Sequence, residues 1–233
     1  MKLAIMQPYF FPYIGYFQLM NAVDEFVVYD NIQFTKQGWF NRNRILVNGT
    51  DAYITFPLKN DSNYHQVRER CLADNWPSEQ KKILGRIESA YRKAPYFKTI
   101  YPLIEKCILF EDLNLFNFIY NSMIAMKEYL GINTQFVVSS TIPIDHELKG
   151  ELKVRAICKA RKADIYFNPI GGIELYDKQK FKSDNIELNF LKTTNVSYPQ
   201  FKNEFIASLS IIDVLMFNSL SQTKEFLHQF ILL

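Results

Sequence analysis

Three stretches of the sequence carry side chains suited to ligand binding, and the first is residues 7–16. It combines two prolines and Phe10 with an amide, a glycine and three tyrosines, namely Gln7, Gly15, Tyr9, Tyr13 and Tyr16. A tyrosine ring offers an apolar face to a base or a sugar, and its hydroxyl offers a hydrogen bond. The pattern indicates a binding turn, and an aromatic-rich core is the alternative interpretation.

The second stretch, residues 36–44, brings cations, an aromatic ring and an amide close together. The charge comes from Lys36, Arg42 and Arg44, the ring from Trp39 and the amide from Asn41. A guanidinium is a planar fork that binds phosphate or carboxylate through two parallel hydrogen bonds. The stretch favours an anion such as a nucleotide diphosphate, and an exposed basic loop before a hairpin is the alternative.

The third stretch follows the strand-like residues 164–167. It runs from Asn168 through a proline to Gly171 and Gly172. Adjacent glycines let backbone N–H groups come close to an anion. A plain turn would have the same composition, so both interpretations stay open.

Two residues are candidates for moving a proton. His65 lies in a polar loop, and an unperturbed imidazole titrates near neutrality. Asp30 ends an apolar run and offers a carboxylate. We expect one of them to act as a general base.

The spacing of the histidines argues against a metal site. His65, His146 and His228 are isolated, with no HExxH or HxH pattern. The three cysteines are widely spaced and form no CxxC, which is typical of reduced thiols in a cytoplasm.

Hydrophobic patterning predicts the elements that position these residues. Short apolar runs typical of buried strands lie at 2–6, 25–30, 135–138, 164–168 and 186–191. Helical spacing is found at 13–23, 76–94, 97–109, 112–130, 150–162 and 177–182, with one or two further helices within 208–231. The pair Asn48-Gly49 between two alternating runs predicts a β-hairpin over 42–58.

We therefore predict a single α/β domain over residues 1–233. Its sheet is mostly parallel and Rossmann-like, with the hairpin 42–58 and a helical insertion at roughly 76–131. Ligands bind such sheets beyond the carboxyl ends of the strands. Gln7, Asp30 and Asn168 should meet there, unless Gln7 and Asn168 only cap the neighbouring turns.

Charge and hydropathy exclude two classes of partner. The net charge of +3, with no arginine-rich run, is too small for a nucleic-acid-binding protein. No apolar run reaches the roughly 18 residues that span a bilayer, so we expect no membrane insertion. We expect a cytoplasmic protein.

The motifs, taken in order, resemble the WbqC-like protein family. The resemblance rests on three groups of segments: Gln7-Pro8-Tyr9-Phe10 through Asp24, Asp30, Gln33-Phe34 and Gly38-Trp39-Phe40-Asn41-Arg42-Asn43; Ile157-Cys158-Lys159, Ala163-Asp164-Ile165-Tyr166 and Gly171-Gly172; and Tyr198-Pro199-Gln200, Phe205 and Leu209 through Leu215. Together they span nearly the whole chain.

The resemblance implies a setting in O-antigen, lipopolysaccharide or other surface-polysaccharide biosynthesis. The implied activity is that of a transferase that forms an amide on a nucleotide-linked amino sugar, by N-acylation or aminoacylation. It implies no tightly bound cofactor and an acyl donor that is a coenzyme A thioester or an acyl carrier protein. The motif residues Gln33 and Tyr198 would join the ligand contacts.

These inferences give each residue a hypothetical role. The aromatic turn stacks on the base or sugar, Arg42 and Arg44 with Lys36 hold the diphosphate, and Asp30 or His65 takes the proton of the amine. The basic helix 151–162 could dock an acidic carrier protein, and a solvated helix face is the alternative.

A second similarity concerns the start of the fold. Pro12-Tyr13-Ile14-Gly15-Tyr16 stands where adenylyl-transferring enzymes of the pantothenate-synthetase type, which are HUP-class nucleotidyltransferases, carry His-x-Gly-His. The glycine is kept and no histidine flanks it. Two alternatives therefore remain: an adenylate-forming ligase or nucleotidyltransferase that uses ATP and magnesium, and a non-catalytic sugar-nucleotide-binding protein.

Overall fold

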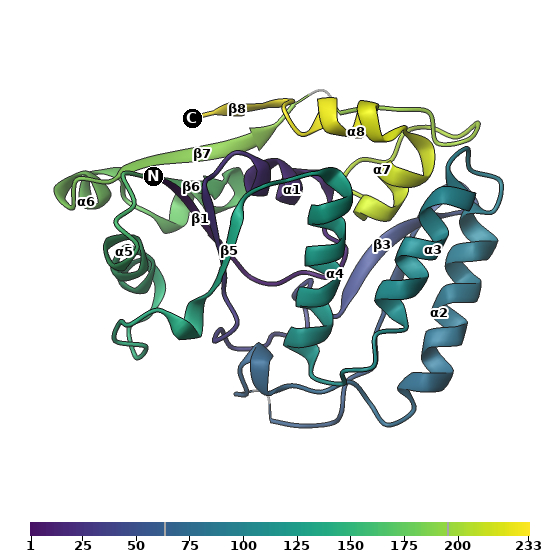
Figure 1. Ribbon diagram of the computed structural model, residues 1–233, viewed down its shortest axis with the longest axis horizontal. Helices are drawn as coiled ribbons and strands as arrows, with labels where there is room; N and C mark the ends of the chain where they lie inside the picture. The colour runs from purple at the N-terminus through teal and green to yellow at the C-terminus, as the bar shows by residue number, and fades with distance from the viewer. Residues whose placement is uncertain (63, 195) are drawn as a thin grey trace.

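The computed structural model describes residues 1–62, 64–194 and 196–233, and within them the chain forms one six-stranded sheet and one two-stranded sheet (Figure 1). The large sheet has the order β5-β2-β1-β6-β7-β8. Its strands are β1 (Lys2–Met6), β2 (Glu25–Val28), β5 (Gln135–Val138), β6 (Ile165–Pro169), β7 (Glu187–Thr193) and β8 (Phe230–Leu232). Every pairing is parallel except that of β7 with β8, so the protein is an α/β protein with a mostly parallel, Rossmann-like sheet.

The chain winds outward from β1 in both directions. It passes from β1 to β2 and then to β5 on one side, and it returns to β6 and β7 on the other side. The order therefore reverses between β1 and β6, which is the switch point where such sheets bind ligands. Gln7 follows β1 directly, and Asn168 lies near the end of β6.

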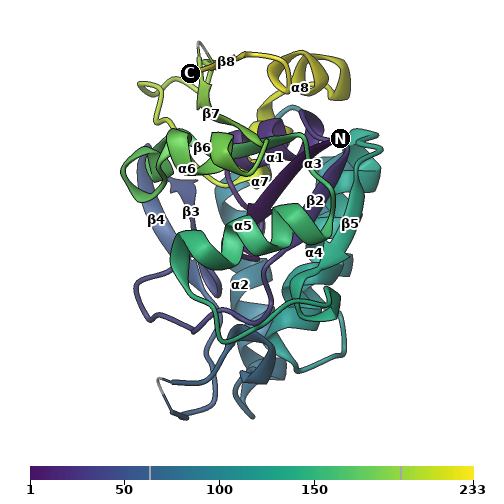
Figure 2. The same cartoon turned by 90° about the vertical axis from the view of Figure 1, so that its left-hand side faces the viewer.

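Helices bury both faces of the sheet, which explains why the strands read as almost continuous apolar runs. Leu3 and Ile5 of β1 pack into a core cluster with α5 (Gly150–Ala160) and α6 (Lys178–Ser183). Ala4, between them, points to the opposite cluster with α1 (Ile14–Asn21). Figure 2 shows α5 lying across one face of the sheet.

The hairpin follows its sequence signature. Strands β3 (Arg42–Val47) and β4 (Thr50–Thr55) pair antiparallel, with Val47 opposite Thr50. The connecting residues Asn48 and Gly49 have φ angles of 51° and 82°, the two left-handed conformations that a type I′ turn requires. The predicted hairpin is confirmed, with its ladder ending at Thr55.

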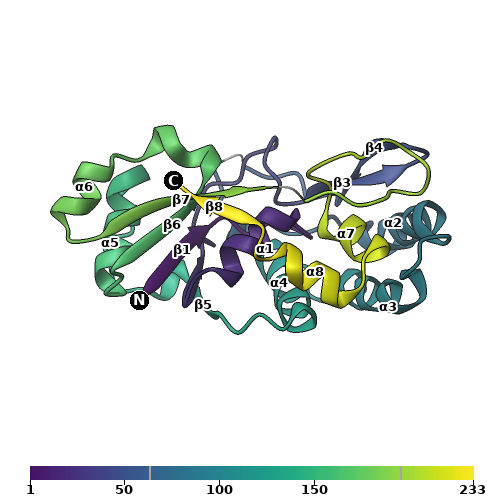
Figure 3. The same ribbon diagram turned by 90° about the horizontal axis from the view of Figure 1, so that it is seen from above.

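Three helices lie between the hairpin and β5, where helical spacing predicts them. They are α2 (Trp76–Tyr91), α3 (Phe97–Ile108) and α4 (Leu115–Leu130). Helix α4 begins later than expected because the Asn114 side chain caps it, accepting a hydrogen bond from the Asn117 N–H at 3.1 Å. Figure 3 shows α2 and α3, with the hairpin and α7 (Ile211–Phe217), at the end of the molecule away from α5 and α6.

The end of the chain differs from the expectation. Helix α7 and α8 (Leu220–Phe226) lie within 208–231 as predicted, but the prediction that β7 is the last strand is wrong. Residues Phe230–Leu232 form β8, which runs antiparallel to β7 with Leu232 opposite Leu191. The reason is that β7 would otherwise leave its outer row of backbone groups unpaired.

A buried carboxylate connects the hairpin to the C-terminal helices. Asp213, fully buried near the start of α7, accepts hydrogen bonds from the hydroxyls of Tyr91 and Tyr198, both at 2.8 Å, and from the Gln200 amide at 2.6 Å. The Tyr91 oxygen in turn accepts the Leu46 N–H of β3 at 2.8 Å. Burial raises the pKa of Asp213, and the three donors oppose that shift.

We expect Asp213→Ala to destabilise the protein by about 3 kcal/mol, because it leaves buried donors without a partner. Asp74→Ala is the matched control: this carboxylate is 86% exposed and pairs with Lys59, so its loss should change stability by less than about 0.5 kcal/mol. Urea denaturation of both variants measures the difference. Equal stability of the two variants would show that the Asp213 network does not hold the hairpin in place.

Candidate functional site

A cavity of about 760 Å³ lies at the switch point of the sheet. Its walls come from the ends of the parallel strands β1, β2, β6 and β7, the turn after β1, the 3-10 helix η3 (Ile170–Leu175) after β6, and residues 43–44 of the hairpin. Its lining residues include Gln7, Tyr9, Tyr13, Tyr29, Trp39, Arg44, Asn168, Gly171, Gly172, Tyr176, Lys192 and Thr193. The cavity therefore lies where the sheet topology places a ligand.

Gln7 presents an amide to this cavity. Its side-chain oxygen accepts a hydrogen bond from the Tyr9 hydroxyl at 3.1 Å, and its backbone carbonyl accepts one from the Tyr16 hydroxyl at 2.8 Å. Within the described parts of the chain the Gln7 side-chain nitrogen donates to no protein group, which leaves it free to donate to a ligand.

Asn168 and Tyr176 line the cavity beside Gln7. Asn168, only 6% exposed, packs so close to Gly172 that a Cβ there would lie 2.7 Å from its amide nitrogen. A Cβ at position 172 would therefore force the Asn168 amide to move. Burial raises the pKa of Tyr176, so at neutral pH this hydroxyl is a neutral donor.

Arg44 brings a cation to the hairpin side of the cavity. Its guanidinium lies 5.9 Å from the centre of the Trp39 ring, and it donates to the Asp51 carboxylate at 3.1 Å and to the Ser208 carbonyl at 3.4 Å. Its Nε is buried, and it has no hydrogen-bond partner among the described residues. A ligand anion could use this fork.

The hairpin is fastened to the turn after β1, which sets the position of Arg44. The Asn43 amide donates to the carbonyls of Phe10 and Phe11 at 2.9 and 2.7 Å. Ser210 connects the same parts, because its N–H donates to the Arg44 carbonyl and its hydroxyl to the Phe11 carbonyl.

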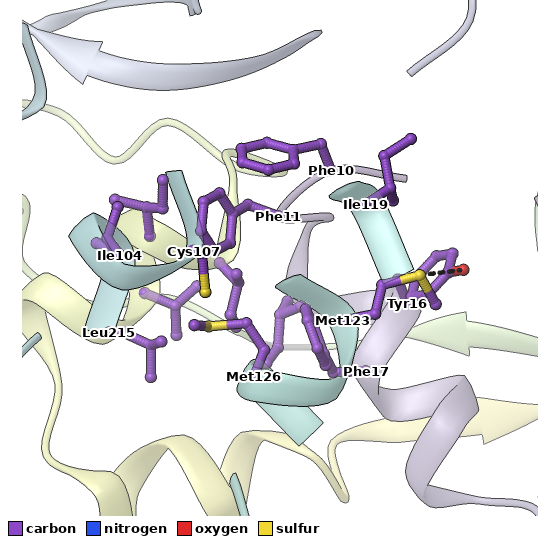
Figure 4. Close-up of a cluster of buried hydrophobic side chains, with 14 of the residues drawn as sticks. Phe10, Phe11, Tyr16, Phe17, Ile104, Cys107, Ile119, Met123, Met126 and Leu215 are labelled. Atoms are coloured by element: carbon purple, nitrogen blue, oxygen red, sulfur yellow. Dashed lines mark hydrogen bonds between the residues drawn. The ribbon is translucent and has the colours of Figure 1, made fainter. Parts of the chain in front are cut away.

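The aromatic turn divides between the cavity and the core. Tyr9 and Tyr13 line the cavity, whereas Phe10 and Tyr16 are buried and do not. Figure 4 shows Phe10 and Tyr16 among side chains of α3 and α4 in the hydrophobic core. Gly15 fits tightly beside this wall, since a Cβ there would lie 2.4 Å from the Tyr13 ring. Stacking by this turn is therefore limited to Tyr9 and Tyr13.

Arg42 does not line the cavity. Its guanidinium donates to the carbonyls of Gly38 and Gln37, and it lies 5.6 Å from the Trp39 ring and 5.2 Å from the Tyr53 ring. These contacts order the loop that carries Trp39. The two arginines of the stretch thus have different surroundings, and only Arg44 reaches the cavity.

The two expected proton acceptors lie outside the lining. Asp30 is 2% exposed, and one of its oxygens accepts from the Ser139 hydroxyl at 2.8 Å and the Ser140 N–H at 2.9 Å, joining the ends of β2 and β5. His65 lies in the loop before α2, with its Nδ1 3.1 Å from the Asp61 carboxylate. The structure therefore does not bring Gln7, Asp30 and Asn168 to one crevice: Gln7 and Asn168 meet there, and Tyr29 takes the place of Asp30.

Four further expected contacts also lie away from the cavity. The Asn41 amide donates to the Phe56 carbonyl at 2.6 Å, and the Tyr198 hydroxyl donates to Asp213. Gln33 forms an isolated bridge with Gln66, and Lys36 is exposed on the loop before Trp39. Each of these residues supports the surrounding loops or faces solvent.

Sequence reasoning missed several lining residues, among them Tyr29, Tyr176, Lys192 and Thr193. Tyr29, Lys192 and Thr193 all stand at strand ends, where the rule that selected Gln7 would also have found them. Tyr29 was missed because β2 ends at Val28 and not at Asp30. The other two were missed because β7 extends to Thr193, beyond the predicted end at 191.

The cavity offers neutral hydrogen-bonding groups, aromatic faces and two cations. As far as the described residues show, no carboxylate, imidazole or thiol lines it. The ionisable lining groups are Arg44, Lys192 and tyrosines, and burial raises the pKa of both Tyr9 and Tyr29 to about 12. At neutral pH these tyrosines donate hydrogen bonds and do not accept protons.

Comparison with known proteins identifies the family. The model of the WbqC-like protein family matches residues 7–225. The chain belongs to this family. It is 29% identical over 232 residues to the uncharacterized protein Rv1507c of Mycobacterium tuberculosis, and the match covers 97% of each chain. No solved structure matches it.

The described parts of this WbqC-like protein contain no cluster of metal ligands, and no thiol lines the cavity. No three His, Cys, Asp or Glu residues gather there to hold a metal ion. The cysteines are free and lie outside the cavity, and burial raises the pKa of the Cys107 thiol to about 12. Among the described helices, none is both apolar and long enough to cross a bilayer.

The basic helix expected to dock a carrier has partners within the chain. Arg155 and Lys159 of α5 both pair with Asp184, at 2.6 and 2.7 Å, and Arg161 pairs with Glu25 at 2.6 Å. Lys153 is 4% exposed and donates to the His146 carbonyl. The positive charge of this helix is therefore largely used inside the molecule.

We expect Gly172→Ala to displace Asn168 from the cavity wall and to lower stability by about 1–3 kcal/mol, as overpacking does. Gly171→Ala is the control, because a Cβ at position 171 meets nothing within 4 Å, and it should change stability by less than about 0.5 kcal/mol. Thermal unfolding of the two variants tests the difference. Two variants of wild-type stability would show that the wall tolerates a Cβ at both positions.

Proposed function

We propose that the cavity binds a nucleotide-linked amino sugar and that the protein transfers an acyl or aminoacyl group to the sugar amine. One observation carries the proposal: a cavity at the switch point has neutral amides and hydroxyls beside aromatic rings, with cations at its edge. The amides, hydroxyls and rings suit a sugar, and the cations suit a diphosphate.

The sugar fits the wall formed by Gln7, Asn168 and Tyr176. Their amide and hydroxyl groups can donate to and accept from sugar hydroxyls without the cost of burying a charge. The Tyr9 and Tyr13 rings supply the apolar faces on which a sugar or base stacks. The size of the cavity, about 760 Å³, suits a ligand with several rings.

The diphosphate fits the hairpin side. Arg44 supports an anion there, because its side chain lines the cavity and is 27% exposed, so that a bound phosphate can reach the guanidinium. Lys192 adds a second cation at the end of β7.

The reaction needs no base from the cavity wall. In aminolysis of a thioester, the sugar nitrogen forms the new C–N bond, the C–S bond breaks, and the ammonium proton passes to the leaving thiolate. The enzyme contributes by orienting the two reactants and by donating hydrogen bonds to the oxygen of the tetrahedral intermediate. Tyr29, neutral at this pH, and the nitrogen of the Gln7 amide supply such donors.

A second candidate is a sugar-nucleotide-binding protein without turnover. The observation that favours it is the lining itself, in which the described residues provide no carboxylate, imidazole or thiol. The adenylate-forming alternative has less support, because Tyr16 is buried at the place of the histidine signature and contributes no charge to phosphates.

Incubation of the purified protein with nucleotide-linked amino sugars and a panel of acyl thioesters tests the transferase. We expect an amide product, detected by mass spectrometry together with release of free thiol. Binding of the sugar nucleotide without product from any thioester would favour the second candidate. Pyrophosphate release from ATP with an acyl acid would support the adenylate-forming alternative.

We expect Arg44→Ala to weaken binding of the nucleotide sugar about tenfold or more, because it removes the cation at the cavity edge. Lys36→Ala is the matched control, since this lysine is exposed and does not line the cavity, and its binding should stay within about twofold of wild type. Thermal-shift titration with nucleotide sugars reports both affinities, because a ligand of the native state raises the melting temperature. Equal losses in both variants would contradict the assignment of Arg44.

A further inference from the structure

A second hollow, of about 860 Å³, lies at the tip of the hairpin. The turn residues Asn48 and Gly49 form one side, the end of α2 forms another, and residues 201–203 close it. We call it the tip groove. It shares no lining residue with the switch-point cavity.

The tip groove is cationic. Its exposed lining residues include Arg92, Lys93 and Lys202, and no carboxylate lines it in the part of the chain that the structure describes. None of these three cations forms an ion pair with a described residue. By contrast, Arg155, Lys159 and Arg161, in and directly after α5, are paired, so their charge is not available to a partner as the charge of the tip groove is.

An aromatic residue stands in the same groove. Phe201 is 40% exposed, and its ring packs edge-on against Phe217 of α7 with 4.8 Å between centroids. Its φ of 54° is a left-handed conformation that costs energy in a residue other than glycine. An exposed aromatic ring among unpaired cations is typical of a protein-binding surface, where such residues act as anchors.

The hairpin connects the tip groove to the cavity. Arg44 of β3 lies at the cavity edge, and Asn48 lies in the groove four residues later. At about 3.3 Å per residue along a strand, the two sites are roughly 13 Å apart. A donor group on a flexible arm could cover that distance while its protein stays in the groove.

We propose that the tip groove docks an acidic acyl carrier protein, whose thioester arm then reaches the cavity. The proposal rests on the proposed transfer of an acyl group. The positive charge of the groove favours an acidic partner. The distance between the groove and Arg44 favours a partner that carries its acyl group on a flexible arm. This surface replaces helix 151–162 as the docking site, because the cations of that helix are paired.

A charge-reversal variant tests the docking without any need for turnover. Arg92→Glu, Lys93→Glu and Lys202→Glu are combined in one variant. Lys81→Glu, Lys98→Glu and Lys106→Glu form the control, because these lysines are equally exposed on α2 and α3 and produce the same change in net charge. The probe is the acyl carrier protein of the host in its holo form, and its Kd is measured by fluorescence anisotropy.

We expect the groove variant to weaken carrier binding about tenfold or more and the control to stay within about threefold. Raising the salt concentration should weaken wild-type binding and have little further effect on the groove variant. Unchanged thermal stability and nucleotide-sugar binding in both variants show that the fold is intact. Should the groove variant unfold, protection of Lys93 and Lys202 from acetylation by the carrier in wild-type protein gives the same answer.

Several results would overturn the docking. These are wild-type protein that does not bind the carrier, equal binding by both variants, and groove-dependent binding of anionic vesicles or RNA in place of the carrier. The outcome is separate from that of the transferase. Turnover with a coenzyme A thioester but no carrier binding removes the docking alone, whereas groove-dependent binding without an amide product removes the transferase alone.

Discussion

The carboxylate of Asp213 is the constraint on which the switch-point cavity and the tip groove both depend. It is fully buried without a cation, and two tyrosine hydroxyls and one amide satisfy it. Such a group is stable only while every donor stays in place, because an unpaired buried charge is costly. The hairpin, α2, α7 and the loop at Gln200 are therefore fixed relative to one another, and with them the Arg44 edge of the cavity and the Phe201 side of the tip groove.

The sheet supplies the second rigid part of the cavity. Gln7 and Asn168 extend from neighbouring parallel strands whose side chains are buried on both faces. Their amides are therefore presented by a backbone that is paired and buried on both sides, while the cations come from the hairpin and from the end of β7. Sites built on strands hold their groups more accurately than sites built on loops, and a transfer reaction gains most from such accuracy. The cavity combines a fixed neutral wall with a cation on an element that the Asp213 network locks in place.

Local sequence signals were enough for most elements and for part of the site. The local sequence alone predicts three elements, which are β1, β5 and the Asn48-Gly49 turn. The structure has them at the predicted residues. Strand β8 has no such signature, since three apolar residues after a helix take their conformation only from β7.

Tyr13 and Tyr16 belong to one motif, yet one faces the cavity and the other the core, because α1 starts between them and turns their side chains apart. Tyr29 and Asp30 show the same limit just after β2, where Tyr29 lines the cavity and Asp30 does not, so an error of one residue exchanges them. The placement of His65 depends on loop packing that no local pattern encodes.

The position of the helices α2, α3 and α4 within the chain has a consequence for how the molecule assembles. Strand β1 pairs with β6 through Lys2 and Ile165, so the central pairing of the sheet joins residues more than half the chain apart. The hairpin and the helical hairpins between them use contacts that are close in sequence, which form faster than distant ones. During synthesis the hairpin and insertion can gain structure while β1 still waits for the strand that completes its second edge. Until β6 leaves the ribosome, an apolar strand is left with one open side, and that interval is when this protein most needs protection from aggregation.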